Sequence, residues 1–271
     1  MRITFIGGGN MATAIIGGLV KRGFDAAGIG VAEIAPAARE RLGRAFALHT
    51  FSAPGEAAPF GDLVVMAVKP QQMREAAQQV APLLRGEPVL SIAAGIRLAD
   101  LSRWLGGHKL LARCMPNTPA LVGAGITAAY CVEQVTPEQR ALVAQVLESV
   151  GALVWVEEEA LLDAVTAVSG SGPAYVFYFI EALEEAAREL GIAPEQARAL
   201  ALATFAGAAR LAEESGEDVR LLRERVTSKG GTTEAALASM KAEAVKEAIV
   251  RAIRAADARA RALGEQLGKD G

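Results

Sequence analysis

Short apolar runs alternate with amphipathic stretches over the first half of the chain. Glycine, proline or charged residues bound each run, as expected for strands. The runs are 3–6, 29–33, 47–51, 63–68, 88–93 and 110–115. Continuous apolar strands separated by amphipathic helices are typical of a parallel sheet that helices cover on both faces. Two further runs, 125–130 and 152–156, flank a helix that begins at Thr136-Pro137, and we expect them to extend the sheet.

Strand patterning ends near Glu157-Glu158-Glu159, and helical periodicity follows to the end of the chain. The expected helices are 160–168, 173–190, 194–215, 218–226, 233–240 and 244–267. We therefore place a domain boundary at the acidic triplet. An N-terminal Rossmann-type, doubly wound α/β domain is expected over residues 1–158, and an all-α domain over residues 159–271.

The segment 174–183 is apolar on nearly every side and carries Tyr175, Phe177, Tyr178 and Phe179. A helix that is hydrophobic all round must be buried, and a domain of about 110 residues has a limited interior. We expect this helix to pack against a second subunit, so that the all-α domain serves for dimerisation. The alternative is a central helix in a monomeric bundle.

The first apolar run breaks into a glycine-rich turn, and a helical pattern follows. The spacing of Gly7, Gly9 and Ala12 matches the fingerprint of dinucleotide-binding turns, which bring a pyrophosphate to the N–H groups of a helix N-terminus. An ordinary glycine-rich turn is the alternative. Glu33, at the end of the next strand, favours the cofactor, because a carboxylate there binds a ribose hydroxyl. The predicted cofactor-binding residues of the turn are Ile6, Gly7, Gly8, Gly9, Asn10, Met11 and Ala12.

Later strands also end in candidate ligand-binding segments, because open α/β sheets bind ligands at the carboxyl ends of their strands. Ala67-Val68-Lys69-Pro70 follows the fourth strand, Ala94 and Gly95 follow the fifth, and Asn117 lies in a proline-bracketed loop after the sixth. We predict that these residues contact the cofactor. A solvated lysine, tight packing and a purely structural loop are the respective alternatives.

Two segments of the all-α domain combine glycine with hydroxyl groups at an expected helix start. Residues 169–173 are predicted to form a flexible turn that opens the long helix at Pro173. Residues 227–234 (Thr-Ser-Lys-Gly-Gly-Thr-Thr-Glu) place backbone N–H groups at a helix N-terminus, which favours a carboxylate ligand. Simple N-capping by Thr232 or Thr233 is the alternative.

Composition narrows the class of partner. The 271-residue chain is 52% hydrophobic and 22% charged with a net charge of −3, which argues against disorder and against nucleic-acid binding. Its apolar runs are short and interrupted, so we expect no membrane span, no signal peptide and a cytoplasmic location.

Cys114 and Cys131 form no Cys-x-x-Cys pair, and His49 and His108 are too few for a metal cluster or a Ser-His-Asp triad. No metal site is expected.

Together these motifs resemble those of the pyrroline-5-carboxylate reductase family. The resemblance runs in order over essentially the whole chain, and its most distinctive part is the segment 226–240. The other matching segments are the glycine-rich N-terminus, 67–70, 93–95, 113–119, 163–166 and 169–175.

The resemblance implies reduction of the C=N bond of Δ1-pyrroline-5-carboxylate, a small imino acid, to L-proline with NAD(P)H in the last step of proline biosynthesis. It also implies a homodimer unit with interlocked helices, often assembled as a decamer of five dimers. Carried onto this sequence, the backbone N–H groups of Gly230, Gly231 and Thr232 bind the substrate carboxylate, and Thr233 lies near the imine nitrogen. The remaining predicted substrate-binding residues are Ser228, Ser171 and Glu159.

Glu33 also bears on the choice between NADH and NADPH. A carboxylate accepts hydrogen bonds from a ribose 2′-hydroxyl and repels a 2′-phosphate, and the residues that follow, Ile34-Ala35-Pro36, are neither basic nor hydroxylic. We therefore expect a leaning toward NADH. Arg39 or Arg41, one helical turn further on, is the group that would instead reach a phosphate.

Two other functions fit parts of the pattern. A β-hydroxyacid dehydrogenase-like enzyme shares the architecture but uses a lysine on the long interdomain helix, and residues 173–190 contain none. A non-catalytic nucleotide sensor would bind NAD(H) and dimerise, which leaves the predicted anion site at 228–233 without a purpose.

Overall fold

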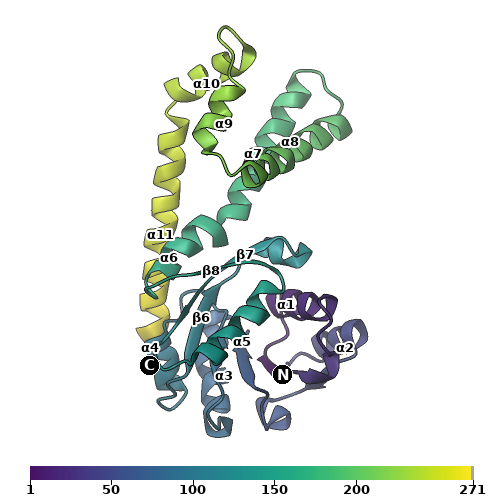
Figure 1. Cartoon of the computed structure of the whole chain (residues 1–271), viewed down its shortest axis with the longest axis vertical. Helices are drawn as coiled ribbons and strands as arrows, with labels where there is room; N and C mark the ends of the chain where they lie inside the picture. Colours follow the sequence, from purple (N-terminus) through teal and green to yellow (C-terminus); the bar gives the residue numbers. More distant parts are fainter. Residues whose placement is uncertain (270–271) are drawn as a thin grey trace. The chain divides into compact units, whose positions relative to one another are not determined.

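The computed structural model describes residues 1–269 of the chain (Figure 1). These residues form an eight-stranded sheet in the order β3-β2-β1-β4-β5-β6-β7-β8. The strands are β1 (Ile3–Ile6), β2 (Ile29–Ala32), β3 (His49–Phe51), β4 (Leu63–Met66), β5 (Val89–Ser91), β6 (Leu111–Met115), β7 (Gly125–Cys131) and β8 (Gly151–Trp155). Several strands end earlier than predicted, so that Ala67 and Ala93 lie in loops.

The chain divides by packing into two units. The first comprises Met1–Ser171 with the described residues from Ala256 onward, and the second comprises Gly172–Ala255. This division differs from the boundary that the sequence pattern predicts at residue 158. The short helix α6 (Leu161–Val165) packs against β6 and β7, which explains why it belongs with the sheet.

Helices cover both faces of the sheet, as predicted. Along β1, Phe5 packs into the core beneath α1 (Asn10–Lys21), α2 (Pro36–Phe46) and α5 (Pro137–Glu148). Ile6 points the other way and packs into the core beneath α3 (Met73–Val80) and α4 (Leu98–Trp104). Successive strand residues alternate in this way because side chains along a strand point to opposite faces. Short 3₁₀ turns join the elements: η1 (Ala26–Gly28), η2 (Pro54–Ala57), η3 (Pro70–Gln72), η4 (Ala81–Leu83) and η5 (Thr118–Val122).

The sheet is parallel, as predicted, except at one junction. Strands β1 to β6 are parallel, but β7 pairs with β6 in antiparallel register, with Cys114 opposite Ala129, and β8 then runs parallel to β7. The physical reason is the connection 116–124, which contains only the turn η5. A parallel partner needs a crossover of a dozen or more residues, usually a helix, and this loop is shorter.

The second unit is helical, as predicted. It contains α7 (Gly172–Glu189), α8 (Pro194–Ser215), α9 (Val219–Arg225) and α10 (Thr232–Ala242), and α11 (Val245–Lys269) begins within it. Helices α7 and α8 pack against each other (Figure 1). Within the single chain α7 nevertheless leaves aromatic side chains exposed: Phe177 is 65% and Tyr178 is 71% exposed.

The predicted flexible turn before α7 is instead helical. Residues Thr166–Gly170 form one turn of π-helix (η6), which follows α6 directly, and Gly172 begins α7. The hydroxyls of Thr166 and Ser169 donate to backbone carbonyls one turn earlier. Such π-turns occur frequently at functional sites. Among residues 1–269 no helix has the length and apolarity that a membrane crossing requires.

Candidate cofactor and substrate sites

The glycine turn lies at the point where the strand order reverses. β1 has β2 on one side and β4 on the other, and ligands of doubly wound sheets bind at this switch point. Gly7 has φ +101°, and a Cβ placed there would lie 2.8 Å from the backbone of Ala67, so only glycine fits. A Cβ on Gly9 would meet nothing within 4 Å. The turn therefore leaves open space at the N-terminus of α1, where a pyrophosphate is expected to bind.

A cavity of about 390 Å³ opens beside this turn. Seven predicted cofactor residues line it: Ile6, Gly7, Gly9, Glu33, Ala67, Val68 and Lys69. Gly8, Asn10, Met11, Ala12 and Pro70 were also predicted but are not among the lining residues. The sequence analysis missed a further set of lining residues on η3 and α3: Gln72, Glu75, Ala76 and Gln79. Their spacing places them on one helical face, and this was the signal that could have revealed them.

Glu33 holds the turn in place. Its carboxylate accepts hydrogen bonds from the N–H groups of Gly8 at 2.7 Å and Ala35 at 2.8 Å. The guanidinium of Arg39 donates to the carbonyls of Glu33 and Ile34, at 2.7 and 2.9 Å. The same carboxylate lines the cavity, whereas Arg39 does not. The cavity therefore presents an acidic group where a ribose is expected.

The predicted contacts after β5 and β6 are ordered by other parts of the first unit. Gly95 has φ +77°, and a Cβ there would lie 3.2 Å from the side chain of Leu267 near the end of α11. Asn117 is 9% exposed, and its side-chain oxygen accepts a hydrogen bond from Ile126 N–H at 3.0 Å. Neither these residues nor Ala94 line the cavity beside the glycine turn.

The predicted substrate loop lies in the second unit, at the start of α10. Gly230 has φ +74°, and its N–H donates to the carboxylate of Glu234 at 2.7 Å. The N–H of Gly231 donates to the carbonyl of Ser228 at 3.0 Å. Gly231 is the N-cap of α10 and offers no capping side chain, so the N–H groups that follow it have no partner within the helix. An internal carboxylate thus already uses one of the predicted substrate-binding amides.

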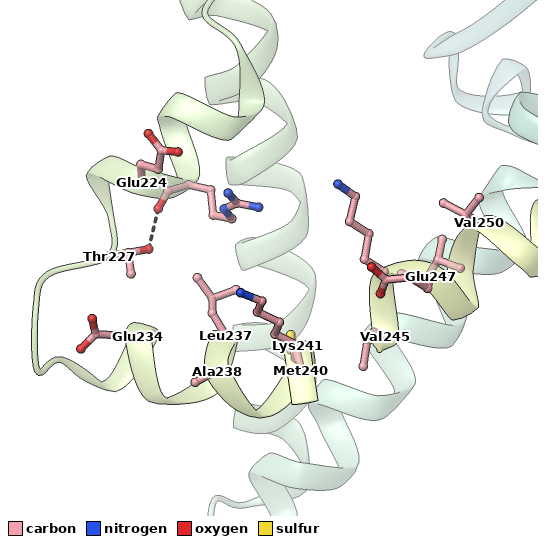
Figure 2. A pocket seen from close by; sticks show the side chains of 13 residues that line it. Glu224, Thr227, Glu234, Leu237, Ala238, Met240, Lys241, Val245, Glu247 and Val250 are labelled. Carbon is pink, nitrogen blue, oxygen red and sulfur yellow. Dashed lines mark hydrogen bonds between the residues drawn. The ribbon is translucent and has the colours of Figure 1, made fainter. Parts of the chain in front are cut away.

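A larger cavity, of about 900 Å³, lies among α9, α10 and the start of α11 (Figure 2). Its walls combine apolar side chains, including Leu237, Met240 and Val245, with the charged Lys241 and Glu247. Within the second unit this cavity therefore adds a mainly apolar surface to the one exposed on α7.

Arg113, Glu159 and Asp163 form an ion cluster in the first unit. Arg113 and Asp163 belong to two of the segments that resemble the reductase family. Arg113, on β6, is 2% exposed. Its guanidinium donates to Glu159 at 3.0 Å and to Asp163 at 3.3 Å. The same oxygen of Glu159 accepts a hydrogen bond from Leu98 N–H at 2.8 Å. Sequence analysis missed Arg113, although a single arginine within an apolar strand was a visible signal. Ser171, predicted to contact substrate, is half-buried at the end of the π-turn.

The two cysteine thiols are held in their protonated form. Burial raises the pKa of the Cys114 thiol far above its usual range and raises the pKa of Cys131 to about 11, with Arg140 opposing the shift at Cys131. In the part of the chain that the structure describes, no group of three or more His, Cys, Asp or Glu side chains is arranged to hold a metal ion.

The doubly wound sheet with its glycine turn defines a dinucleotide-dependent oxidoreductase. Residues 2–95 match the family described as NADP oxidoreductase, coenzyme F420-dependent, and residues 159–263 match the family described as pyrroline-5-carboxylate reductase dimerisation. A pyrroline-5-carboxylate reductase from Pseudomonas aeruginosa is 44% identical over 269 residues, which cover 99% of this chain and 98% of that protein. The chain belongs to the pyrroline-5-carboxylate reductase family.

Solved structures agree with this assignment. A pyrroline-5-carboxylate reductase from Coxiella burnetii superposes with a TM-score of 0.92 at 38% identity, over 97% of this chain and 98% of that one. A pyrroline carboxylate reductase from Plasmodium falciparum, solved with NADP bound, superposes with a TM-score of 0.87 at 28% identity and the same coverage. The predicted α/β fold, helical C-terminal part and family are confirmed.

Proposed function

We propose that this protein reduces the C=N bond of Δ1-pyrroline-5-carboxylate to L-proline with NAD(P)H. The observation that carries the proposal is a full-length match to reductases of this name in a chain that keeps an open glycine turn and an uncapped glycine-to-helix turn. The first turn suits a pyrophosphate and the second suits a carboxylate, because both present helix N-termini.

The cofactor fits the residues of the first unit. Gly7 and Gly9 leave room for a pyrophosphate, and Glu33 lies where a ribose hydroxyl would donate to it. A bound dihydronicotinamide supplies the hydride that adds to the imine carbon. The chain's own task is to hold the two reactants and to stabilise the nitrogen as it gains a proton.

We assign the substrate to the loop before α10. The N–H groups of Gly230, Gly231 and Thr232 would bind its carboxylate, helped by the positive end of the helix dipole. Thr233, half-buried in the first turn of α10, would donate its hydroxyl hydrogen bond to the imine nitrogen, directly or through water. A hydroxyl is a weak acid at neutral pH, so its role is orientation as much as proton transfer. Ser228 and Ser171 complete the proposed set.

The Thr233→Ala variant tests this assignment. We expect a lower kcat with unchanged NADH affinity, because the hydroxyl acts on the imine and not on the cofactor. The neighbouring Thr232→Val variant is the control, since it keeps the backbone N–H that binds the carboxylate. Wild-type turnover in Thr233→Ala would refute the role of the hydroxyl.

We propose that the enzyme prefers NADH. The support is Glu33, which lines the cavity at the end of β2, while the Arg39 guanidinium is bonded to the carbonyls of Glu33 and Ile34. A carboxylate at this position accepts a ribose 2′-hydroxyl and repels a 2′-phosphate. Lys69 and Glu75 also line the cavity and carry opposite charges. Comparing kcat/KM for the two cofactors decides the question, and Glu33→Ser should narrow the difference. A clear NADPH preference of the wild type would refute the proposal.

We propose a homodimer as the unit of assembly, with five dimers forming a decamer. The family match over 159–263 is to a dimerisation domain, and α7 exposes Phe177 and Tyr178. We assign two surfaces to the contact with the second subunit: these rings, and the apolar wall of the cavity among α9, α10 and the start of α11 (Figure 2). Sedimentation should give a multiple of the 28.2 kDa chain mass, and Tyr178→Asp should reduce it. Arg44→Asp, on the exposed surface of α2, is the control. A monomeric wild type would contradict the proposal.

A further inference from the structure

In the cluster of Arg113, Glu159 and Asp163, one carboxylate also binds a backbone N–H of another segment. One guanidinium, 3% exposed, faces two carboxylates, of which Asp163 is 8% and Glu159 is 24% exposed. Glu159 also makes a bond outside the cluster: its Oε1 accepts the N–H of Leu98 at 2.8 Å. Glu159 therefore links Arg113 on β6 to the start of α4.

Leu98 is the first residue of α4. The N-cap residue Arg97 makes no side-chain capping bond, so the helix lacks a local cap. Glu159, 61 residues further along the chain, supplies a charged acceptor to that helix start instead. A carboxylate at this position both satisfies an unpaired N–H and complements the helix dipole.

The segment fixed by this contact is the loop 92–97 between β5 and α4. At its start, Ile92 N–H donates to Met66 O of the neighbouring strand at 3.2 Å. At its end, Glu159 holds Leu98. Between them lie Ala94 and Gly95, which follow the carboxyl end of β5, the strand next to β4 on the side away from β1. Ligands of open α/β sheets bind at the carboxyl ends of the strands, and we expect the nicotinamide end of the cofactor here.

We propose that Glu159 is a positioning residue for the cofactor, not a substrate contact. Its carboxylate holds the loop 92–97 through Leu98 N–H, and Arg113 in turn holds the carboxylate in a single orientation. The inference rests on the proposed function for its nicotinamide cofactor, but it requires only that the protein bind NADH.

The experiment is fluorescence titration of the purified full-length protein with NADH alone. Glu159→Ala should weaken NADH binding about fivefold to tenfold, as expected for the loss of a helix cap that orders a binding loop. Glu159→Gln should stay within about twofold of wild type, because its amide oxygen remains an acceptor for both donors. Asp163→Ala is the matched control: it removes the other carboxylate from Arg113 and should lower the melting temperature without weakening NADH binding.

A second variant removes the donor of the hydrogen bond between Leu98 N–H and Glu159. Leu98→Pro removes the donor N–H at the first helical position, where proline is tolerated, and leaves Glu159 paired with Arg113. It should weaken NADH binding as Glu159→Ala does, and it keeps the test available if Glu159→Ala does not fold.

Three results would overturn the proposal. The first is equal loss of NADH binding in Glu159→Ala and Asp163→Ala, which would indicate general destabilisation. The second is wild-type NADH binding in both Glu159→Ala and Leu98→Pro. The third is a Glu159→Gln variant with normal NADH binding but a raised KM for the imine, which would indicate direct substrate contact. Failure of the proposed reaction itself would appear separately, as wild-type protein that binds NADH but does not oxidise it with the imine.

Discussion

Replacement of Arg113 by methionine tests the energetics of the buried cluster. The side chain of Arg113 is 3% exposed, those of Asp163 and Glu159 are 8% and 24% exposed, and the pairs are 3.3 and 3.0 Å long. Methionine fills much of the same volume but leaves both carboxylates without their cation. Removing one partner of a buried ion pair costs about 3–5 kcal/mol, chiefly because the remaining charge is desolvated and unpaired. We expect the free energy of unfolding to fall by that amount.

The assay is urea unfolding followed by circular dichroism, at one fixed protein concentration because the protein is expected to self-associate. Arg44→Met is the matched control: its exposed pair with Glu40 should contribute less than about 1 kcal/mol. The double variant Arg113→Met/Asp163→Asn should recover part of the lost stability, since it removes the most buried unpaired charge. A single variant within 1 kcal/mol of wild type (roughly the ceiling for an exposed pair), or a double variant no more stable than the single one, would refute the reasoning.

Three further predictions concern other sites. Gly9→Val should keep the wild-type melting temperature in scanning calorimetry, because a side chain there meets open space. It should weaken NADH binding in calorimetric titration more than about tenfold by filling the pyrophosphate site, and wild-type NADH binding would contradict this. Glu234→Gln should lower the KM for the imine about threefold with kcat unchanged, because Gly230 N–H no longer holds a competing charged carboxylate; a raised KM in steady-state kinetics would show that the contact helps binding. Cys131, with a pKa of about 11, stays a neutral thiol at pH 8 and should resist iodoacetamide in the native protein, becoming reactive in urea; rapid native labelling seen by mass spectrometry would contradict this.

Local features of the sequence predicted much of the first unit. The glycine turn, the strand before it and Glu33 are close in sequence, and their geometry follows from backbone rules that glycine alone satisfies. Gly7, Gly9, Ala67 and Glu33 line one cavity, and their contact with the cofactor stays a prediction. The helical second unit was equally visible, because a period of 3.6 persists there without strand patterning.

Features that depend on long-range partners could not be predicted. The pairing of Arg113 with Glu159 joins residues 46 positions apart, and no local pattern specifies which carboxylate a buried arginine will meet. The antiparallel placement of β7 is an exception, because the loop 116–124 is visibly too short in the sequence for a parallel crossover. The π-turn at 166–170 differs from an α-helix by one residue per turn, which hydrophobic periodicity over so short a segment does not resolve.

Glu234 illustrates a further limit. Its position three residues after the N-cap is typical of a capping residue, whereas the sequence analysis considered capping only by Thr232 or Thr233. The structure shows the carboxylate bonded to Gly230 N–H, one of the groups assigned to the substrate. Residue types alone do not reveal that a chain's own carboxylate will compete for such a site.

The proposed reductase activity is measured by incubating the purified wild-type protein with NADH and racemic Δ1-pyrroline-5-carboxylate. The oxidation of NADH is followed by absorbance, and proline is quantified by chiral chromatography. We expect oxidation that depends on the imine, with one L-proline formed for each NADH consumed. NADH binding without imine-dependent oxidation would contradict it and would favour a nucleotide sensor.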